Sequence, residues 1–275
     1  MLFKRYCPLI LRDEKQNERR DFGSGFAIYG AYQIAYLKRI IEKEYQNQEN
    51  VMRLIIIRHG DPDYEKNCLT ELGKKQAKLM AQRLLKEGIT EIWTSPYGRA
   101  VETAEAFSEV SGIKDIHKLN FMKEIRYGRI DALYQDLNPW FGVDDMIFEG
   151  WDLRDQNWRT HPLYRENTAT EDVDIIATKT DKWLSDLGYE REGQYYRCTG
   201  KEETERTIAL FCHGGSGTAM ISHIYNLAFP FLCGTIHMPC TAISILRFDR
   251  RKGSLNLPIV ELLSDATHLK EPEDN

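Results

Sequence analysis

The sequence feature that most constrains the fold is a short apolar run, which begins after Arg53 and ends at Ile57. A continuous apolar run of this length is typical of a strand that is buried on both faces of a sheet. Residues 91–94 and 207–212 form two further predicted strands. Strands buried on both faces need helices on either side of their sheet, which indicates the α/β class of fold.

Helical patterns follow each of these predicted strands. Thr70 is a good N-cap residue, and apolar residues recur after it at helical spacing until Gly88, a typical helix end. Pro96 is predicted to open a second helix, and Gly214-Gly215 turns the chain into a third. Two more strands are predicted at residues 242–248 and 257–263. The alternation predicts a three-layer α/β/α sandwich with a mostly parallel central sheet.

The segments outside this alternation divide the chain. Residues 1–51 are predicted to be an N-terminal extension, either poorly ordered or helical, because an amphipathic pattern covers residues 26–46. Residues 52–275 are predicted to form the main domain. Within this domain, residues 129–206 are less regular and rich in tryptophan, tyrosine and arginine, and they are predicted to form a cap-like insert.

The charge of the chain limits the partners that it can bind. Its 37 basic and 42 acidic residues give a net charge of −5. This balance argues against general binding to nucleic acid or to membrane surfaces, which requires a basic face. No run is long and apolar enough for a transmembrane helix or a secretory signal, and the six cysteines lack metal-binding or redox spacing. We therefore expect a cytoplasmic protein with free thiols.

Residues that can carry chemistry follow three of the predicted strands directly. They are Arg58-His59-Gly60, Ser95-Pro96-Tyr97-Gly98-Arg99 and His213-Gly214-Gly215. In sheets of this kind, ligands bind beyond the C-terminal ends of the strands. Two histidines and two arginines are therefore predicted to face one cleft.

This set of side chains suits a phosphate group. The guanidinium groups of Arg58 and Arg99 can each bind two oxygens at once. His213, if protonated, adds a charged donor, and its pKa would rise beside an anion. Gly214 lies at a predicted helix start, where free N–H groups favour an anion. The predicted phosphate-binding residues are Arg58, His59, Arg99, His213 and Gly214, with no metal or other cofactor.

Within this pocket, His59 is predicted to be the nucleophile. A neutral imidazole nitrogen can attack phosphorus if an acceptor, such as a backbone carbonyl, holds the opposite nitrogen as N–H. The departing alkoxide requires a proton, for which Glu124 is the predicted donor and later the base for water, with Asp61 and Glu171 as acidic alternatives. The predicted catalytic residues are His59, Glu124, His213, Arg58 and Arg99.

Five elements of the sequence occur in a characteristic order. They are Arg58-His59-Gly60, Leu69-Thr70-Glu-Leu-Gly73, Ser95-Pro96-x-x-Arg99-Ala100-x-x-Thr103-Ala104, Glu124 and His213-Gly214-Gly215. Over about residues 52–125 and 205–250, this order resembles the histidine phosphatase superfamily, also called the phosphoglycerate mutase-like family. The resemblance implies an α/β/α fold, phosphorylation of His59 and no metal requirement. It also implies that Arg58, Arg99 and His213 form the phosphate pocket and that Glu124 is the proton donor.

The segment after Gly60 differs from the mutase branch of this family. Mutases follow the Arg-His-Gly motif with a Ser and an Asn that contact phosphate, and then with a Gly-Trp pair. Here that pair is absent, and Glu65 stands near the position of the Asn. A carboxylate at this position would repel a second phosphate. The difference therefore favours hydrolysis of a substrate with one phosphate.

Hydrolysis of a phosphate monoester on a small phosphorylated metabolite is thus the leading hypothesis. The alternatives are phosphoglycerate mutase-type transfer, a phosphoprotein phosphatase and non-catalytic binding of a phosphorylated ligand. A phosphoprotein phosphatase would prefer an open cleft, whereas residues 129–206 are predicted to cover this one. A non-catalytic binder would usually have lost one of the pocket residues, all of which are present.

The predicted insert offers a second hypothesis about the substrate. A capping box formed by Thr168 and Glu171 predicts a helix inside it. If the insert is a lid, then Arg154, Arg159 or Arg165 would bind a second anionic group.

Overall fold

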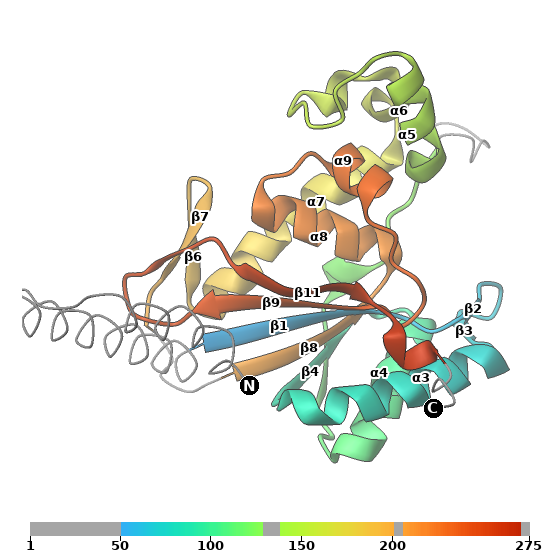
Figure 1. Cartoon of the computed structure of the whole chain (residues 1–275), viewed down its shortest axis with the longest axis vertical. Coiled ribbons are helices and arrows are strands. Elements are labelled where there is room, and N and C mark those ends of the chain that lie inside the picture. Colours follow the sequence, from blue (N-terminus) through green and yellow to red (C-terminus); the bar gives the residue numbers. More distant parts are fainter. Residues whose placement is uncertain (1–50, 129–137, 201–205, 271–275) are drawn as a thin grey trace, which may run out of the picture. The chain divides into compact units, whose positions relative to one another are not determined.

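Six strands form the central sheet of the computed structural model, which describes residues 51–128, 138–200 and 206–270 (Figure 1). In sheet order they are β11 (Ile259–Asp265), β9 (Ile243–Asp249), β1 (Val51–Arg58), β8 (Arg206–Cys212), β4 (Glu91–Thr94) and β5 (Ile116–Lys118). The pairs from β1 to β5 are parallel, and β9 and β11 run antiparallel to their neighbours. The predicted mostly parallel sheet is confirmed.

Strand β1 lies inside the central sheet, between β9 and β8, and has a core on each of its faces. Leu54 and Ile56 belong to one cluster of buried apolar side chains, whereas Ile55 and Ile57 belong to the other. Successive side chains of a strand point to opposite faces, so a strand covered on both sides must be apolar throughout. This is the physical reason for the unbroken apolar run in the sequence.

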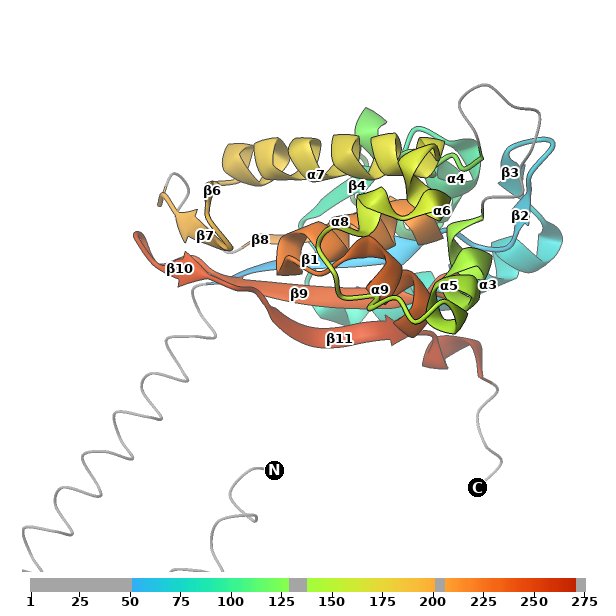
Figure 2. The same cartoon turned by 90° about the horizontal axis from the view of Figure 1, so that it is seen from above.

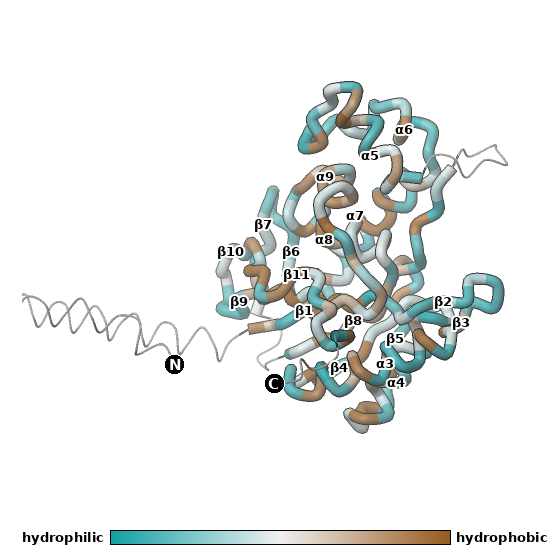
Figure 3. Tube along the Cα trace, turned by 45° about the vertical axis from the view of Figure 1, so that its right-hand side comes forward, coloured by the Kyte–Doolittle hydropathy of each residue, from teal (hydrophilic) through white to brown (hydrophobic). Residues whose placement is uncertain are grey.

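Four long helices cover the two faces of the sheet. One face packs against α3 (Glu71–Leu84) and α4 (Gly98–Ser111), and the other against α7 (Thr168–Asp186) and α8 (Gly214–Tyr225), as Figures 1 and 2 show. Along α3 and α4 apolar and polar residues alternate (Figure 3), as expected of helices with one face in a core. The predicted three-layer sandwich is confirmed.

Two helix starts differ from the sequence prediction. Helix α4 begins at Gly98 rather than at Pro96, because Tyr97 before it is still extended and serves as its N-cap. Glycine suits position 98, since a Cβ there would lie 2.2 Å from the carbonyl oxygen of Asn67. Helix α7 is capped by Asn167 and not by Thr168. The Asn167 side chain accepts hydrogen bonds from the N–H groups of Ala169 and of distant Gly128. The cap of α3 is Thr70, as predicted.

Shorter elements complete the described part of the chain. They are the strands β2 (Pro62–Asp63), β3 (Cys68–Leu69), β6 (Tyr189–Glu192), β7 (Tyr195–Cys198) and β10 (Leu255–Asn256), the helices α5 (Pro139–Phe148), α6 (Pro162–Arg165) and α9 (Phe229–Thr235), and the 3-10 turns η2 (Leu85–Glu87), η3 (Asn120–Met122), η4 (Trp158–Thr160) and η5 (Thr267–Leu269). Strands β2 and β3 form a hairpin directly after β1, and β10, β7 and β6 form a small second sheet. Helices α5, α6 and α9 lie on the side of α7 and α8 (Figure 1).

The stretch predicted as an insert is not one uniform layer. Its helix α7 packs on the central sheet beside α8, while α5, η4 and α6 lie further out (Figure 1). Residues 1–50, including the amphipathic pattern at 26–46, lie outside the described residues. The domain boundaries therefore stay a prediction. No helix in the described ranges has the length and apolar character needed to cross a membrane.

Candidate active site

The register of the parallel strands brings the predicted site residues to one edge of the sheet. Arg58 at the end of β1 lies opposite Cys212 at the end of β8. The N–H of His59 donates to the Cys212 carbonyl at 2.9 Å, and the N–H of Ser95 donates to the Phe211 carbonyl at 2.8 Å. His59, Ser95 and His213 therefore begin the loops that leave three adjacent strands.

The His59 ring is held in one tautomer. Its Nδ1–H donates to the backbone carbonyl of Gly60 at 2.6 Å, so the lone pair lies on Nε2. Arg99 Nε donates to this Nε2 at 3.3 Å. Burial lowers the pKa of His59 to about 3, and Arg58 and Arg99 act in the same direction. The ring is thus neutral, with its free lone pair directed at a cation.

The neutral His59 should make the protein sensitive to acid. In an unfolded chain the pKa of histidine is about 6.5, whereas the folded value is about 3. The free energy of unfolding therefore does not depend on His59 above about pH 6.5. Below that pH it decreases, because the unfolded histidine binds a proton that the folded one does not, until the pH reaches about 3. At pH 5 the loss amounts to about 2 kcal/mol. In phosphate-free buffer, the free energy of unfolding of the wild type should fall more between pH 7.5 and 5 than that of His59→Gln. Equal declines would contradict the neutral, buried ring.

Arg99 is buried and its guanidinium is fixed from several sides. Its Nη1 donates to Asn67 Oδ1 at 2.9 Å, and its guanidinium carbon lies 5.0 Å from the ring centre of Tyr97 and 5.3 Å from that of Tyr64. Burial lowers the pKa of Arg99 from its ordinary value. A guanidinium remains charged in proteins, so Arg99 brings a fixed positive charge to Nε2 of His59.

Arg58 also points into the site. Its Nη1 donates to the Met238 carbonyl, and its Nε is buried without a hydrogen-bond partner. A Cβ on Gly214 would lie 3.5 Å from this Nε, so the guanidinium lies against the first residue of α8. An unpaired buried N–H is costly, and an anion is one kind of group that would satisfy it.

His213 lies beside His59, with 5.1 Å between the ring centres. Its Nε2 is 2.7 Å from the hydroxyl oxygen of Ser95. Burial lowers the pKa of His213 well below its ordinary value, and His59 and the two arginines lower it further. These effects favour the neutral ring, and the protonation of His213 beside a bound anion stays a prediction.

Glu124 joins the cluster from the segment after η3. Its Oε1 accepts hydrogen bonds from the N–H groups of Ser216, at 3.1 Å, and Ile125, at 3.0 Å. Burial raises the pKa of this carboxyl group above its ordinary value, against the effect of these N–H groups. Gly215 permits the approach, because a Cβ there would lie 2.6 Å from Glu124 Oε1.

The structure places the two alternative acids elsewhere. The carboxylate of Asp61 accepts a hydrogen bond from the Thr70 hydroxyl at 2.6 Å. Glu171 lies on α7 and pairs with Arg126 at 3.5 Å. Of the three candidates, Glu124 is the one that lines the cavity described below.

Sequence reasoning missed Asn67 as a member of the site. Glu65, which the sequence analysis placed near the position of the mutase Asn, is exposed on the β2–β3 turn. Asn67, two residues later in the chain, accepts a hydrogen bond from Arg99. The left-handed backbone of Asn67, with φ of 53°, is a conformation that Asn tolerates well. Ser95, which the sequence analysis placed directly after a buried strand, joins the site through its contact with His213.

A cavity of about 540 Å³ opens beside the cluster. Arg58, Glu124 and Gly214 contribute to its lining. The rest comes from the β2–β3 turn, the segment after η3, the start of α5, helix α8, and α9 with the segment after it. Among the described residues, no three His, Cys, Asp or Glu side chains lie close enough together to hold a metal ion.

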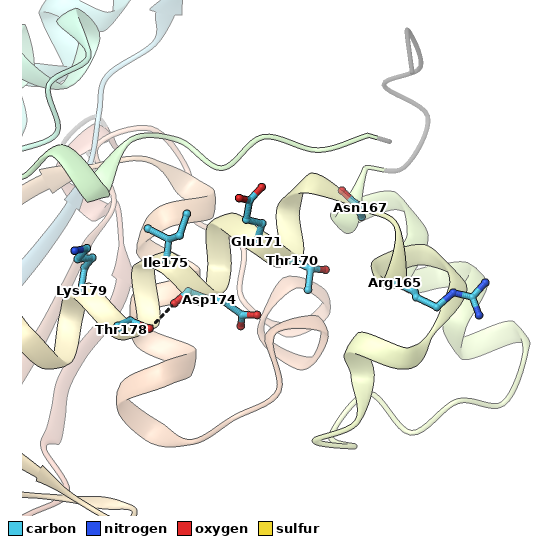
Figure 4. A pocket seen from close by; sticks show the side chains of 8 residues that line it. All are labelled: Arg165, Asn167, Thr170, Glu171, Asp174, Ile175, Thr178 and Lys179. Carbon is cyan, nitrogen blue, oxygen red and sulfur yellow. Dashed lines mark hydrogen bonds between the residues drawn. The ribbon is translucent and has the colours of Figure 1, made fainter. Parts of the chain in front are cut away.

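A second hollow lies along α7, away from this cluster. Figure 4 shows Glu171, Ile175 and Lys179 projecting from α7 in one row, with Arg165 beyond the start of the helix. Arg154 pairs with Asp152, and Arg159 with Asp174. Arg154, Arg159 and Arg165 do not line the cavity beside the cluster. The hypothesis that these arginines bind a second anionic group there is therefore wrong.

Comparisons with known proteins match most of this chain. A family model described as the histidine phosphatase superfamily (branch 1) matches residues 54–259. The probable phosphoglycerate mutase GpmB of Serratia proteamaculans is 30% identical over 234 residues, which cover 81% of this chain and 97% of that protein.

Two solved structures are similar in fold. The phosphoserine phosphatase of Entamoeba histolytica, in complex with 3-phosphoglyceric acid, has a TM-score of 0.53 and 20% identity and covers 80% of this chain and 100% of its own. A mycobacterial glucosyl-3-phosphoglycerate phosphatase has a TM-score of 0.52 and 19% identity. The match covers 78% of this chain and 99% of the mycobacterial chain.

Proposed function

The chain belongs to the histidine phosphatase superfamily and is an enzyme of the phosphatase type, and we propose that it hydrolyses a phosphate monoester through phosphohistidine on His59 without a metal ion. Residues 52–275 are the proposed catalytic domain. The proposed substrate is a small phosphorylated metabolite, and the proposed location is the cytoplasm.

One observation carries this proposal. The neutral His59 ring holds its proton on Nδ1, against the Gly60 carbonyl, and directs Nε2 at the guanidinium of Arg99. A nitrogen lone pair beside a fixed cation suits attack on a phosphorus atom whose oxygens that cation binds. A histidine that only filled the core would not need a charged partner in a buried position.

Binding of the substrate phosphate is the first proposed step. Its oxygens replace Nε2 of His59 as the partner of Arg99 and satisfy the unpaired Nε of Arg58. His213 lies close enough to His59 to contact the same group. A dianion beside His213 would favour its protonated form and add a third charged donor.

Transfer to His59 is the second step. Nε2 forms a bond to phosphorus while the bond from phosphorus to the alcohol oxygen breaks, and Glu124 gives its proton to that oxygen. The raised pKa of Glu124 favours the protonated form that this step needs. Water then attacks phosphohistidine, its proton passes to Glu124, and the nitrogen–phosphorus bond breaks. The enzyme returns to its starting state with phosphate released.

The test is phosphate release in the presence of EDTA. We expect the purified protein to release phosphate from p-nitrophenyl phosphate and from some phosphorylated metabolites at rates that EDTA does not change. The positive charge of Arg58 and Arg99 takes the place of a metal in this proposal. Loss of activity in EDTA that added metal restores would contradict the metal-free route.

The same preparation tests the alternative of mutase-type transfer. Transfer must be compared with hydrolysis because one relative, which is 30% identical to this chain, is named as a probable phosphoglycerate mutase. Interconversion of 2- and 3-phosphoglycerate faster than phosphate release would replace hydrolysis by transfer. Release of no phosphate and no interconversion would leave the cleft as a binding site.

A further inference from the structure

The cavity beside the active-site cluster has a wall that the proposed mechanism does not use. Its aromatic members are Tyr64 on the β2–β3 turn, Tyr127, and Trp140 on α5. Ile125, Ile236 and Met238 add apolar surface to the same lining. A cavity of about 540 Å³ has room for more than a phosphate group, since it falls in the range of sites for small organic ligands.

The charges of this cavity are confined to the phosphate-binding side. Within the described lining, the side chains of Lys, Arg, Asp or Glu are those of Arg58 and Glu124 alone. The polar residues elsewhere in the wall are Asn138, Thr218, Thr235 and His237. Both charged groups are taken up by the phosphate and by the leaving oxygen in the proposed reaction. The described wall therefore offers no cation from Lys or Arg to a second anionic group.

This distribution selects against a charged alcohol. A carboxylate or a second phosphate would lose water there without a Lys or Arg partner from the described wall, which is costly. A flat ring, in contrast, can lie against aromatic side chains and gain from burial and from stacking. Trp140 is already held in place, because its ring meets Phe229 edge to face at 6.4 Å between centres.

We propose that the substrate is the monophosphate of an uncharged alcohol that carries a planar ring, such as a nucleoside or an aryl alcohol. This inference rests on the proposed phosphatase function and narrows its substrate class. It separates this chain from similar proteins whose names specify phosphoserine or phosphoglycerate, both of which carry a carboxylate.

Two matched pairs of substrates test the charge and the ring separately. Glycerol 3-phosphate has a hydroxymethyl group where 3-phosphoglycerate has a carboxylate. Benzyl phosphate carries an aromatic ring where n-butyl phosphate carries an alkyl chain. Both release a primary alcohol of similar acidity. We expect the value of kcat/KM at pH 8 to be about tenfold higher for the first member of each pair.

Two variants connect these preferences to the wall. Thr235 is exposed at the cavity, so Thr235→Arg supplies a cation without disturbing the core and should raise kcat/KM for 3-phosphoglycerate relative to glycerol 3-phosphate. Trp140→Leu should reduce the preference for benzyl over n-butyl phosphate toward one. Tyr127→Leu provides the same test if Trp140→Leu does not fold.

The outcomes separate this inference from the proposed function. Faster hydrolysis of 3-phosphoglycerate than of glycerol 3-phosphate would overturn the substrate class while hydrolysis itself stands. Equal rates for the benzyl and butyl esters would remove the ring from the proposal. If no member of the panel is hydrolysed, the proposed function fails and this inference fails with it.

Discussion

Replacement of His59 by alanine is expected to lower kcat/KM by about ten-thousand-fold, whichever phosphate ester is used. The reason is that the variant has no atom at the position of Nε2 that can form the bond to phosphorus. The neighbouring arginines remain, so inorganic phosphate should still bind. Steady-state rates and phosphate binding by calorimetry would show these two effects separately.

The intermediate itself can be trapped. Wild-type protein quenched during turnover of a ³²P-labelled ester should carry label that survives base and is lost in acid, as phosphohistidine does, and His59→Ala should carry none. His117→Ala is the matched control, because His117 is exposed and lies outside the cluster. Since His59 is buried, His59→Asn serves as a second variant if alanine disturbs folding. More than a few per cent of wild-type activity in both variants would rule out His59 as the nucleophile.

Replacement of Glu124 by glutamine is expected to slow the first turnover of an alkyl phosphate by about a hundred- to a ten-thousand-fold. The same change should slow the first turnover of p-nitrophenyl phosphate far less, because nitrophenolate leaves without a proton. Glutamine keeps the oxygen that accepts from the Ser216 and Ile125 N–H groups. Rapid-quench measurement of product in one turnover isolates this step from the later attack of water.

The pH dependence gives a second measure of the role of Glu124. Its proton is needed for the first step, so the rate with an alkyl phosphate should fall as the pH rises through the raised pKa of this group. This decline should be absent in Glu124→Gln. Glu171→Gln is the matched control, because Glu171 lies on α7, pairs with Arg126 and should leave both rates unchanged. An equal loss on both esters would mean that Glu124 does not protonate the leaving group.

The sequence by itself determined the sheet, its layers and the meeting point of the site residues. An apolar run covered on both faces identifies a central strand, and parallel strands end at one edge, so Arg58, His59 and His213 had to come together. These are consequences of local pattern and of backbone geometry. The cap at Thr70 is local in the same sense, because its partner is the N–H of Gly73.

The tertiary structure alone decided how these groups are charged and held. Burial lowers the pKa of His213, and His59 and the two arginines lower it further, and neither effect is visible in the residues beside it. Asn67 reaches Arg99 across 32 positions of the chain, and Asn167 replaces Thr168 as a cap with help from Gly128. Hydrogen bonds and desolvation depend on which distant segments come into contact, and local sequence patterns do not contain that information.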